Sequence, residues 1–399
     1  MNCPEKRVLI LGAGRGQTEL YRSAKRFGFT AIAASVAGDY PGFALADEIV
    51  YADISDKLAV SEAVEALHID AVATACIDTG IEALGYVCDK FSLRGPSAPV
   101  GALSADKLLM KEAFRRHCLP SPEFRKITCE DDLKTVRNEL RYPLVVKAVD
   151  LQGSRGISIV SSDGRLSEAY SAAMAETRAA YCIVEEYVEG IDCGAQALVV
   201  NGDVLFVLPT GNISFRGKTN IPVGHYVPFD ADPAVLNRID AVCRSAVSEL
   251  GIDNCAVNFD LIVSGDRVYI IELTSRLGAN CLPELINAYY GVNVYDCVIA
   301  AAAGVPVPST RFERVCRETY LARMILPSET GVIRSIENRN HPCPGVIDSS
   351  FFVRPGDQVH RFENSRHCAG QVIVKGNSLA ECMTLADSTI DNIDLIMMP

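Results

Sequence analysis

Hydrophobic positions in the first hundred residues alternate between short apolar runs and stretches with helical spacing. Short apolar runs bounded by glycine or polar residues are typical of buried strands, whereas apolar residues that recur every three or four positions indicate amphipathic helices. The predicted strands are Val8–Leu11, Thr30–Ala34 and Ala71–Ala75, and the predicted helices are Thr18–Phe27, Leu58–Leu67 and Ile81–Cys88. Strand–helix alternation of this kind builds a parallel sheet with helices on both faces. We therefore expect an α/β domain over residues 1–100, with its exit at Ser97-Ala98-Pro99 and Gly101.

The pattern changes over residues 101–308, where strand-like runs follow one another through Gly- and Asp-rich turns. A helix over Ser104–His117 is stopped by Pro120 and Pro122. The later elements are strands at Leu144–Lys147, Ile157–Val160, Cys182–Val188, Ala195–Val200 and Val204–Leu208, a helix at Val235–Leu250, and a hairpin of Ala256–Val263 with Val268–Leu273. This order predicts an α+β domain with an antiparallel sheet.

Residues 309–399 predict a small α+β accessory domain. Short strand-like runs lie near Tyr320–Ile325, Phe351–Val353 and Gln371–Val374, and a closing helix is expected at Leu379–Asp391. The fold class expected for the whole chain is thus α/β, in three domains: 1–100, 101–308 and 309–399.

Composition narrows the class of protein. Hydrophobic residues make up 49% of the chain and charged residues 22%, which is typical of a globular protein. The net charge of -12, without a Lys/Arg block, argues against nucleic acid as a partner. The 15 cysteines are scattered singly through apolar segments, so we expect free thiols in a reducing compartment rather than disulfides. The apolar stretch from Val292 to Pro308 is too short to span a bilayer. We expect a cytoplasmic protein without a membrane partner.

A glycine turn, Gly12-Ala-Gly14-Arg-Gly16, follows the first strand and opens a helix. Backbone amides at such a position attract anions, so the turn could belong to a dinucleotide site. The spacing differs from the fingerprint because Gln17 stands where the third glycine belongs. A tight packing turn, with some substrate contact, is the favoured interpretation, and an NAD-dependent oxidoreductase is kept as an alternative from another class.

The strongest candidate chemistry is a set of cations near a second glycine loop. Lys147 ends an apolar strand, where a buried ammonium needs an anion beside it. Six residues later comes Gly153-Ser154-Arg155-Gly156, a loop that can fold over phosphate oxygens. Lys107, at the start of a helix, offers a second cation. Together these residues favour a triphosphate clamp, although each lysine alone would be read as a solvated surface residue.

Acidic residues supply the rest of the predicted site. The segment Glu185-Glu186-Tyr187-Val188 can present its backbone to adenine, and Asp192 can hold ribose hydroxyls; a strand ending in a solvated acidic turn is the alternative. Asp260 and Glu272 lie on the two strands of the predicted hairpin, where paired carboxylates can bind magnesium with phosphate oxygens. Arg276, four residues after Glu272, can neutralise a transferring phosphoryl group.

The order and spacing of these residues resemble the ATP-grasp superfamily, over most of the chain. The likeness is to the halves of carbamoyl-phosphate synthase, biotin carboxylase, the purine-pathway carboxylases and transformylases, and above all the L-amino-acid (dipeptide) ligases. It implies an ATP-grasp fold with a pre-ATP-grasp parallel-sheet domain, and ATP with Mg2+, or Mn2+ in its place, as cofactors. The nucleotide contacts that it implies are Lys107, Lys147, Ser154, Arg155, Gly156, Glu185, Glu186, Tyr187, Val188 and Asp192. It also implies Asp260 and Glu272 as metal ligands, and Arg276 with Lys147 as catalytic residues.

One departure from the family pattern concerns the metal site. The family often has Glu-x-Asn-x-Arg, whereas this chain has Glu272-Leu-Thr274-Ser-Arg276, so a second magnesium would be held less completely or through water. The stretch from Arg276 to Glu284 looks like the amino-acid-ligase branch. His225 either faces the acceptor site or caps a strand, and Asn280 either holds a substrate carboxylate or caps the helix that begins near Leu282.

The resemblance implies a carboxylate–amine ligase that works through an acyl phosphate on small-molecule substrates, with amino acids among the candidates. Within the superfamily, a bicarbonate-using carboxylase or a formate-using transformylase is the alternative. A non-catalytic nucleotide sensor and the NAD-dependent oxidoreductase stand outside it. Relatives commonly dimerise, so a homodimer is one candidate, and the sequence leaves the oligomeric state open.

Overall fold

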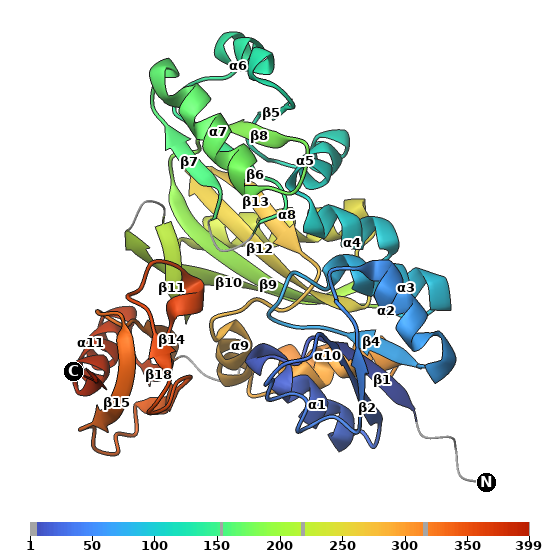
Figure 1. Ribbon diagram of the computed structural model, residues 1–399, viewed down its shortest axis with the longest axis vertical. Helices are drawn as coiled ribbons and strands as arrows, with labels where there is room; N and C mark the ends of the chain where they lie inside the picture. The colour runs from blue at the N-terminus through green and yellow to red at the C-terminus, as the bar shows by residue number, and fades with distance from the viewer. Residues whose placement is uncertain (1–5, 152–154, 217–219, 314–317, 399) are drawn as a thin grey trace.

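The N-terminal region is a parallel four-stranded sheet covered by helices on both faces (Figure 1). The computed structural model describes residues 6–151, 155–216, 220–313 and 318–398. The strand order is β3-β2-β1-β4, with β1 Arg7–Leu11, β2 Thr30–Ser35, β3 Glu48–Tyr51 and β4 Ala71–Ala73. The helices are α1 Thr18–Arg26, α2 Lys57–Val64 and α3 Ile81–Phe91. Alternate residues of β1 divide the core: Val8 and Ile10 pack on the side of α1, and Leu9 and Leu11 on the side of α2 and α3. The parallel α/β prediction is confirmed.

The junction after this sheet differs from the prediction of one helix over Ser104–His117. Two helices, α4 Ala98–Ala105 and α5 Lys107–Arg116, meet at Asp106. The Asp106 carboxylate accepts hydrogen bonds from the backbone N–H groups of Leu108 and Leu109, which starts a new helix there. The expected exit segment near Gly101 is itself helical, because Ser97 caps α4 and a proline occupies its first turn.

A small antiparallel sheet follows, in the order β5-β8-β6-β7. Its strands are β5 Phe124–Ile127, β6 Leu144–Ala148, β7 Ile157–Val160 and β8 Cys182–Glu186, and its helices are α6 Leu133–Glu139 and α7 Leu166–Glu176. Leu144 and Val146 of β6 join Leu133 of α6 and Leu166 of α7 in one core. The neighbouring residue Lys147 therefore points to the opposite face of the sheet.

A large antiparallel sheet forms the middle of the molecule (Figure 1), in the order β13-β12-β9-β10-β11-β14-β18-β16. Its first five strands in sequence are β9 Ile191–Val200, β10 Asp203–Arg216, β11 Asn220–Val227, β12 Cys255–Ser264 and β13 Arg267–Thr274. The helix α8, Pro233–Leu250, packs on one face with α5. Two further helices, α9 Leu282–Tyr290 and α10 Val294–Ala303, pack in the same core as β1 and α1.

The C-terminal strands extend the large sheet instead of forming a wholly separate one. They are β14 Thr319–Ile325, β16 Val346–Phe351 and β18 Gly370–Gly376, the second of which lies earlier than the predicted run at Phe351–Val353. A three-stranded sheet of β15 Gly331–Asn338, β17 Gln358–Val359 and β19 Ile393–Met397 and the helix α11, Leu379–Asp391, complete this region. The domain limits near residues 100 and 308 stay predictions. Strands from both sides of residue 308 belong to the same eight-stranded sheet.

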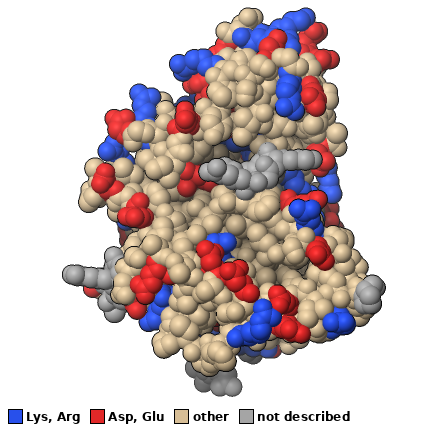
Figure 2. All heavy atoms as spheres, turned by 90° about the vertical axis from the view of Figure 1, so that its left-hand side faces the viewer, with Lys and Arg blue, Asp and Glu red and all other residues tan. Residues whose placement is uncertain are grey.

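The cysteines and the surface agree with a globular protein. Every cysteine that the structure describes is free, and most are buried, as predicted. Within the described ranges, none of the helices combines the length and the apolar character that crossing a bilayer requires. Acidic and basic side chains are interspersed over the face shown in Figure 2.

Candidate active site

A cleft of about 450 Å³ opens between the small sheet and the large sheet. Strands β9 to β13 supply most of its wall, and β6 and β7 supply another part. The loops after β4 and β13 and the first residues of α5 and α9 complete it. The predicted site residues that line it are Lys107, Lys147, Asp192, His225, Asp260, Glu272, Arg276 and Asn280. Residues separated by more than 150 positions in the sequence thus meet in one cavity, which the ligase interpretation requires.

The cationic side of the cleft is built around the buried carboxylate Glu185. Lys147 of β6 forms an ion pair with it, and Lys111 of α5 forms another at 3.0 Å. Burial by itself would raise the pKa of Glu185, but the charges of Lys111 and Lys147 outweigh burial and lower it. Glu185 therefore stays ionised and holds the Lys147 ammonium at the cleft wall.

Lys111 is a residue that the sequence analysis missed. Its side chain is 2% exposed, and Nζ also donates to Ser121 Oγ at 2.9 Å. Burial lowers the pKa of Lys111 to about 8, although Glu185 opposes this shift. The sequence did indicate that Lys111 is buried, because helical spacing places it on the buried face of α5. The residues of that face include Lys107, Met110, Lys111 and Phe114.

The acidic side of the cleft is formed by the β12–β13 hairpin. Asp260 and Glu272 are direct partners in the ladder, so their side chains leave the same face of the sheet. Asp260 is open to the cleft, but the surrounding protein and the negative charges of Glu272 and Asp192 raise its pKa to about 7. Lys107 lies 3.3 Å from Glu272 and donates to the carbonyl of Leu151 at 2.8 Å.

This hairpin fits a divalent cation. Two facing carboxylates repel each other when both are ionised. A cation bound between them would offset that repulsion. Two rungs along the ladder, on the same face of the sheet, Asn258 pairs with Thr274, whose buried Oγ1 has no hydrogen-bond partner among the described residues. Asp260 and Glu272 would hold the metal, with Thr274 offering one neutral oxygen nearby.

The far end of the cleft contains Arg276, which is nearly buried. Its Nε donates to Asp78 Oδ1 at 2.6 Å, and Nη1 donates to the carbonyl of Leu277 at 3.1 Å. Asp78, in the loop after β4, was not predicted. Asn280 also lines this end, but the N-cap of α9 is Cys281, without a side-chain cap bond. The capping alternative for Asn280 is therefore wrong.

His225 belongs to a polar row that crosses three strands. Asn212 Nδ2 donates to Asp192 Oδ1 at 3.1 Å, and Asn212 Oδ1 lies 2.9 Å from His225 Nδ1. Because the amide nitrogen faces a carboxylate, its oxygen must accept from Nδ1–H, which fixes the tautomer of the imidazole. Burial lowers the pKa of His225 to about 4, so the ring is neutral at physiological pH. His225 and Asn212 both line the cleft; a role of His225 in the acceptor site stays a prediction, and Asn212 is an additional residue.

The predicted adenine and phosphate segments lie at the edge of this arrangement. The Glu186 side chain forms an ion pair with Arg141, and Tyr187 donates its backbone N–H to the carbonyl of Pro143 at 2.9 Å. Val188 follows the end of β8 and is half-buried. Ser154 lies outside the described residues. After it come Arg155 and then Gly156, whose carbonyl accepts a hydrogen bond from Ala148. The nucleotide roles of these residues stay predictions.

The first glycine turn is filled by protein atoms. A Cβ on Gly12 would lie 3.0 Å from Gln17 Oε1, and Gln17 Nε2 donates to the carbonyl of Ala75 at 2.5 Å. The side chain of Gln17 thus occupies the hollow where a dinucleotide phosphate would have to lie. This geometry supports the packing turn over an NAD site.

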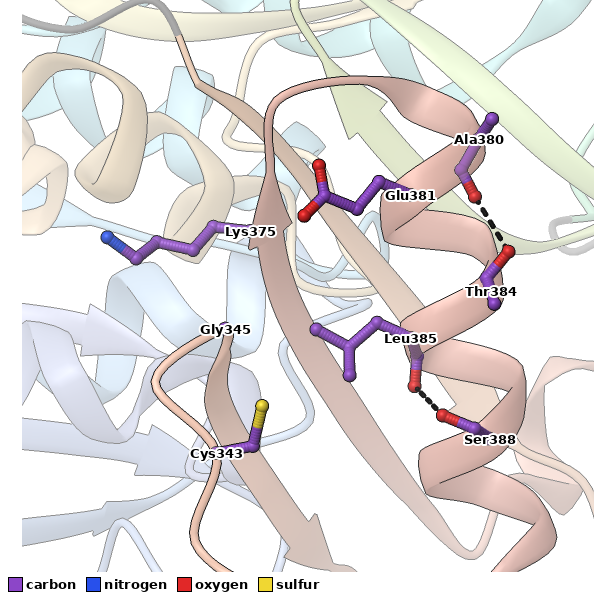
Figure 3. Close-up of a pocket in the computed structure, with 8 residues that line it drawn as sticks. All are labelled: Cys343, Gly345, Lys375, Ala380, Glu381, Thr384, Leu385 and Ser388. Carbon is purple, nitrogen blue, oxygen red and sulfur yellow. Dashed lines mark hydrogen bonds between the residues drawn. The ribbon is translucent and has the colours of Figure 1, made fainter.

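A second hollow, of about 590 Å³, lies in the C-terminal region (Figure 3). Leu385 projects toward it from α11, and the hollow is open to solvent. Its charged groups have other partners: Lys375 pairs with Glu318 at 3.0 Å, and Glu381 accepts a hydrogen bond from the backbone of Asn377. It contains none of the predicted site residues, so the chemistry is placed in the cleft.

Known proteins match this chain over nearly its whole length. A family model described as an ATP-grasp domain matches residues 104–280, and one described as L-amino acid ligase C-terminal domain 2 matches residues 323–398. The crystal structure of phosphoribosylglycinamide synthetase from Anaerococcus prevotii is 39% identical, with a TM-score of 0.84, over 99% of this chain and 100% of that one. The chain belongs to the ATP-grasp superfamily.

Two further ATP-grasp relatives differ in the activity that they are named for. The L-amino acid ligase from Bacillus licheniformis is 20% identical with a TM-score of 0.84, and the comparison covers 99% of each chain. The formate-dependent phosphoribosylglycinamide formyltransferase of Synechococcus sp. (strain WH7803) is 26% identical, over 96% of this chain and 95% of the relative. As a member of the ATP-grasp superfamily, this protein is an ATP-dependent ligase that uses Mg2+, as predicted.

Proposed function

We propose that this ATP-grasp enzyme is a carboxylate–amine ligase that forms an amide bond through an acyl phosphate, with amino acids as its substrates. The observation that carries the proposal is the meeting of Lys107 and Lys147 with Asp260 and Glu272 in one cleft. Cations for phosphates and carboxylates for a metal are what a phosphoryl-transfer site needs, because its catalysis is mostly positioning and charge neutralisation.

Each residue then has a defined task. Lys107 and Lys147 bind phosphate oxygens, and Glu185 keeps Lys147 in place. Asp260 and Glu272 hold Mg2+, which when bound neutralises charge on the transferring phosphoryl group. A substrate carboxylate oxygen attacks the γ-phosphorus beside Arg276, and the bond to the ADP oxygen breaks. The amine nitrogen then attacks the acyl carbon, inorganic phosphate leaves with the C–O electron pair, and the amine loses a proton to solvent.

The charge of the cleft favours substrates without a phosphate group. Its lining cations among the described residues are each paired with a carboxylate: Lys107 with Glu272, Lys147 with Glu185, and Arg276 with Asp78. A phosphorylated amine would need further cations beyond those that hold ATP. The match of the C-terminal region to an L-amino acid ligase domain supports the same class.

A second candidate is formylation of a phosphoribosyl amine with formate. It is favoured by the name of a relative that is similar over nearly the whole chain, a formate-dependent phosphoribosylglycinamide formyltransferase. The phosphate group of such an amine would have to bind at residues other than Lys107, Lys147 and Arg276, which are paired with carboxylates. Homodimer formation and a cytoplasmic location stay predictions under either candidate.

The test is ADP release with Mg-ATP and a panel of substrates. Pooled amino acids should stimulate release in the wild type, whereas formate with glycinamide ribonucleotide, or bicarbonate, should not. The variant Lys147→Ala should lose more than about 99% of this turnover, since it removes a phosphate-binding cation, while Lys134→Ala, on the exposed surface, should keep it. Stimulation by formate and the ribonucleotide alone would replace the first candidate by the second. Full turnover by Lys147→Ala would remove the basis of both.

A further inference from the structure

A directed chain of hydrogen bonds runs beneath the metal-binding carboxylates. The backbone N–H of Gly278 donates to Gln196 Oε1 at 2.9 Å, Gln196 Nε2 donates to Asn258 Oδ1 at 2.5 Å, and Asn258 Nδ2 donates to Asp260 Oδ1 at 3.3 Å. A backbone N–H can only donate, so Gln196 must turn its oxygen toward Gly278. This orientation leaves the amide nitrogens to point successively toward Asp260.

Strand register places these amides directly beside the site. Asn258 pairs with Gln196 of β9 on one side and with Thr274 of β13 on the other. Asp260 lies two residues further along β12, so its side chain leaves the same face of the sheet. Gln196 is 1% exposed, and a buried amide without its partners would be costly. The chain of bonds is thus a built part of the cleft wall.

The loop that carries Arg276 and Asn280 is seated on the same two amides. A Cβ on Gly278 would lie 2.7 Å from Asn258 Oδ1 and 2.9 Å from Gln196 Nε2, distances too short for a side chain. Glycine at this position lets the backbone approach the amides closely enough for its N–H to reach Gln196. The loop position and the Asp260 carboxylate therefore depend on one pair of side chains.

We propose that Gln196 and Asn258 are positioning residues that orient the Asp260 carboxylate and seat the loop around Gly278 at the same time. The proposal rests on the proposed role of Asp260 in holding the metal. Carboxylates that bind metals are themselves oriented by hydrogen bonds from the surrounding protein, and losing such a bond weakens metal binding by about 10- to 100-fold. Here the same bond is linked, through Gln196, to the end of the cleft where Arg276 lies.

The test uses two variants and a matched control. Gln196→Met removes the bonds of Gln196 to Gly278 and Asn258 while keeping a similar length, and Asn258→Ala removes the donor to Asp260. Thr389→Val is the control, because Thr389 is also buried and donates a side-chain hydrogen bond, to the carbonyl of Leu385, but lies in α11 away from the cleft. Binding of Mn2+ in the presence of ADP is measured by electron paramagnetic resonance, and amide hydrogen exchange is measured for the peptide that contains Gly278.

We expect each variant to weaken Mn2+ binding about tenfold or more and to speed exchange around Gly278, and the control to do neither. Folding is checked by circular dichroism, and either variant alone carries the test. Wild-type Mn2+ affinity in a folded variant, or equal effects in Thr389→Val, would overturn the positioning role. Absence of Mn2+–ADP binding by the wild-type protein would instead overturn the proposed function, and the positioning role with it.

Discussion

Replacing Lys111 by Met should stabilise the protein, although it removes an ion pair. Burial lowers the pKa of Lys111 from 10.5 to about 8 even with Glu185 at 3.0 Å. A shift of this size amounts to about 3 kcal/mol against the charged side chain at neutral pH. Met has a similar volume and no charge, and the lost hydrogen bond to Ser121 costs about 1 kcal/mol. Glu185 keeps Lys147 as a second counter-charge, so its carboxylate is not left unpaired. We therefore expect Lys111→Met to raise the free energy of unfolding by about 2 kcal/mol at pH 7.

The pH dependence of stability gives a second, independent signature. The pKa of Lys111 is lower in the folded protein than in the unfolded chain, so the unfolded chain binds more protons between pH 8 and 10.5. The contribution of Lys111 to wild-type stability should therefore become less unfavourable as the pH rises through this window. Lys111→Met should lack this contribution, and its advantage over the wild type should shrink accordingly.

Urea unfolding of both proteins, at pH 7 and across the window, measures both effects. Glu185→Gln is the informative contrast, because it leaves Lys111 and Lys147 without their shared counter-charge and should cost about 3–5 kcal/mol. The reasoning is refuted if Lys111→Met is less stable than the wild type at pH 7, or if its advantage stays constant with pH. A more stable variant with lower ADP release would indicate that Lys111 is kept for its effect on Glu185 and Lys147.

Two further predictions concern the Asp260 carboxylate and the close contact between helices α3 and α4. Asp260→Asn should raise the stability of the metal-free protein by about 1 kcal/mol, a small figure because the carboxylate is open to solvent. The same variant should reduce the stabilisation by Mg-ADP. Thermal unfolding in EDTA and in Mg-ADP measures both effects, and a lower melting temperature of the variant in EDTA would contradict the repulsion between the carboxylates. Gly101→Ala should destabilise by about 1–3 kcal/mol, because its Cβ would lie 2.8 Å from the backbone oxygen of Ile81. Gly164→Ala is the control, because a Cβ there would have no atom within 4 Å. Equal melting temperatures for the two variants would show that α3 and α4 can move apart at no cost.

The parts of the site that could be predicted lie on locally readable elements. Asp260 and Glu272 were found because two apolar runs around a Gly-containing turn indicate a hairpin, and a hairpin determines which residues face each other. Lys147 was found because an ammonium at the end of a buried strand needs an explanation. Lys111 was missed although helical spacing places it on the buried stripe of α5, because lysine is rarely a buried residue and does not stand out as one in a sequence.

The parts that could not be predicted depend on strand order. Asn212 reaches both Asp192 and His225 only because β10 lies between β9 and β11, and Gln196 reaches Asn258 only because β12 pairs with β9. Periodicity in one sequence does not specify such non-local pairing. Asp78 illustrates the same limit, because its contact with Arg276 joins loops that are 198 positions apart. The break between α4 and α5 was readable in principle from Asp106, a helix-capping residue.

The position of α10 has a consequence for how the chain is made. This helix packs in the same core as Val8 and Ile10 of β1, opposite the face that α2 and α3 cover. During synthesis the N-terminal strands leave the ribosome about 200 residues before α10 does. Part of the apolar sheet face on which α10 packs therefore stays exposed until α10 has been made. A fragment that ends near residue 100 would expose the same surface permanently and should aggregate, whereas the full chain closes it with its own helix.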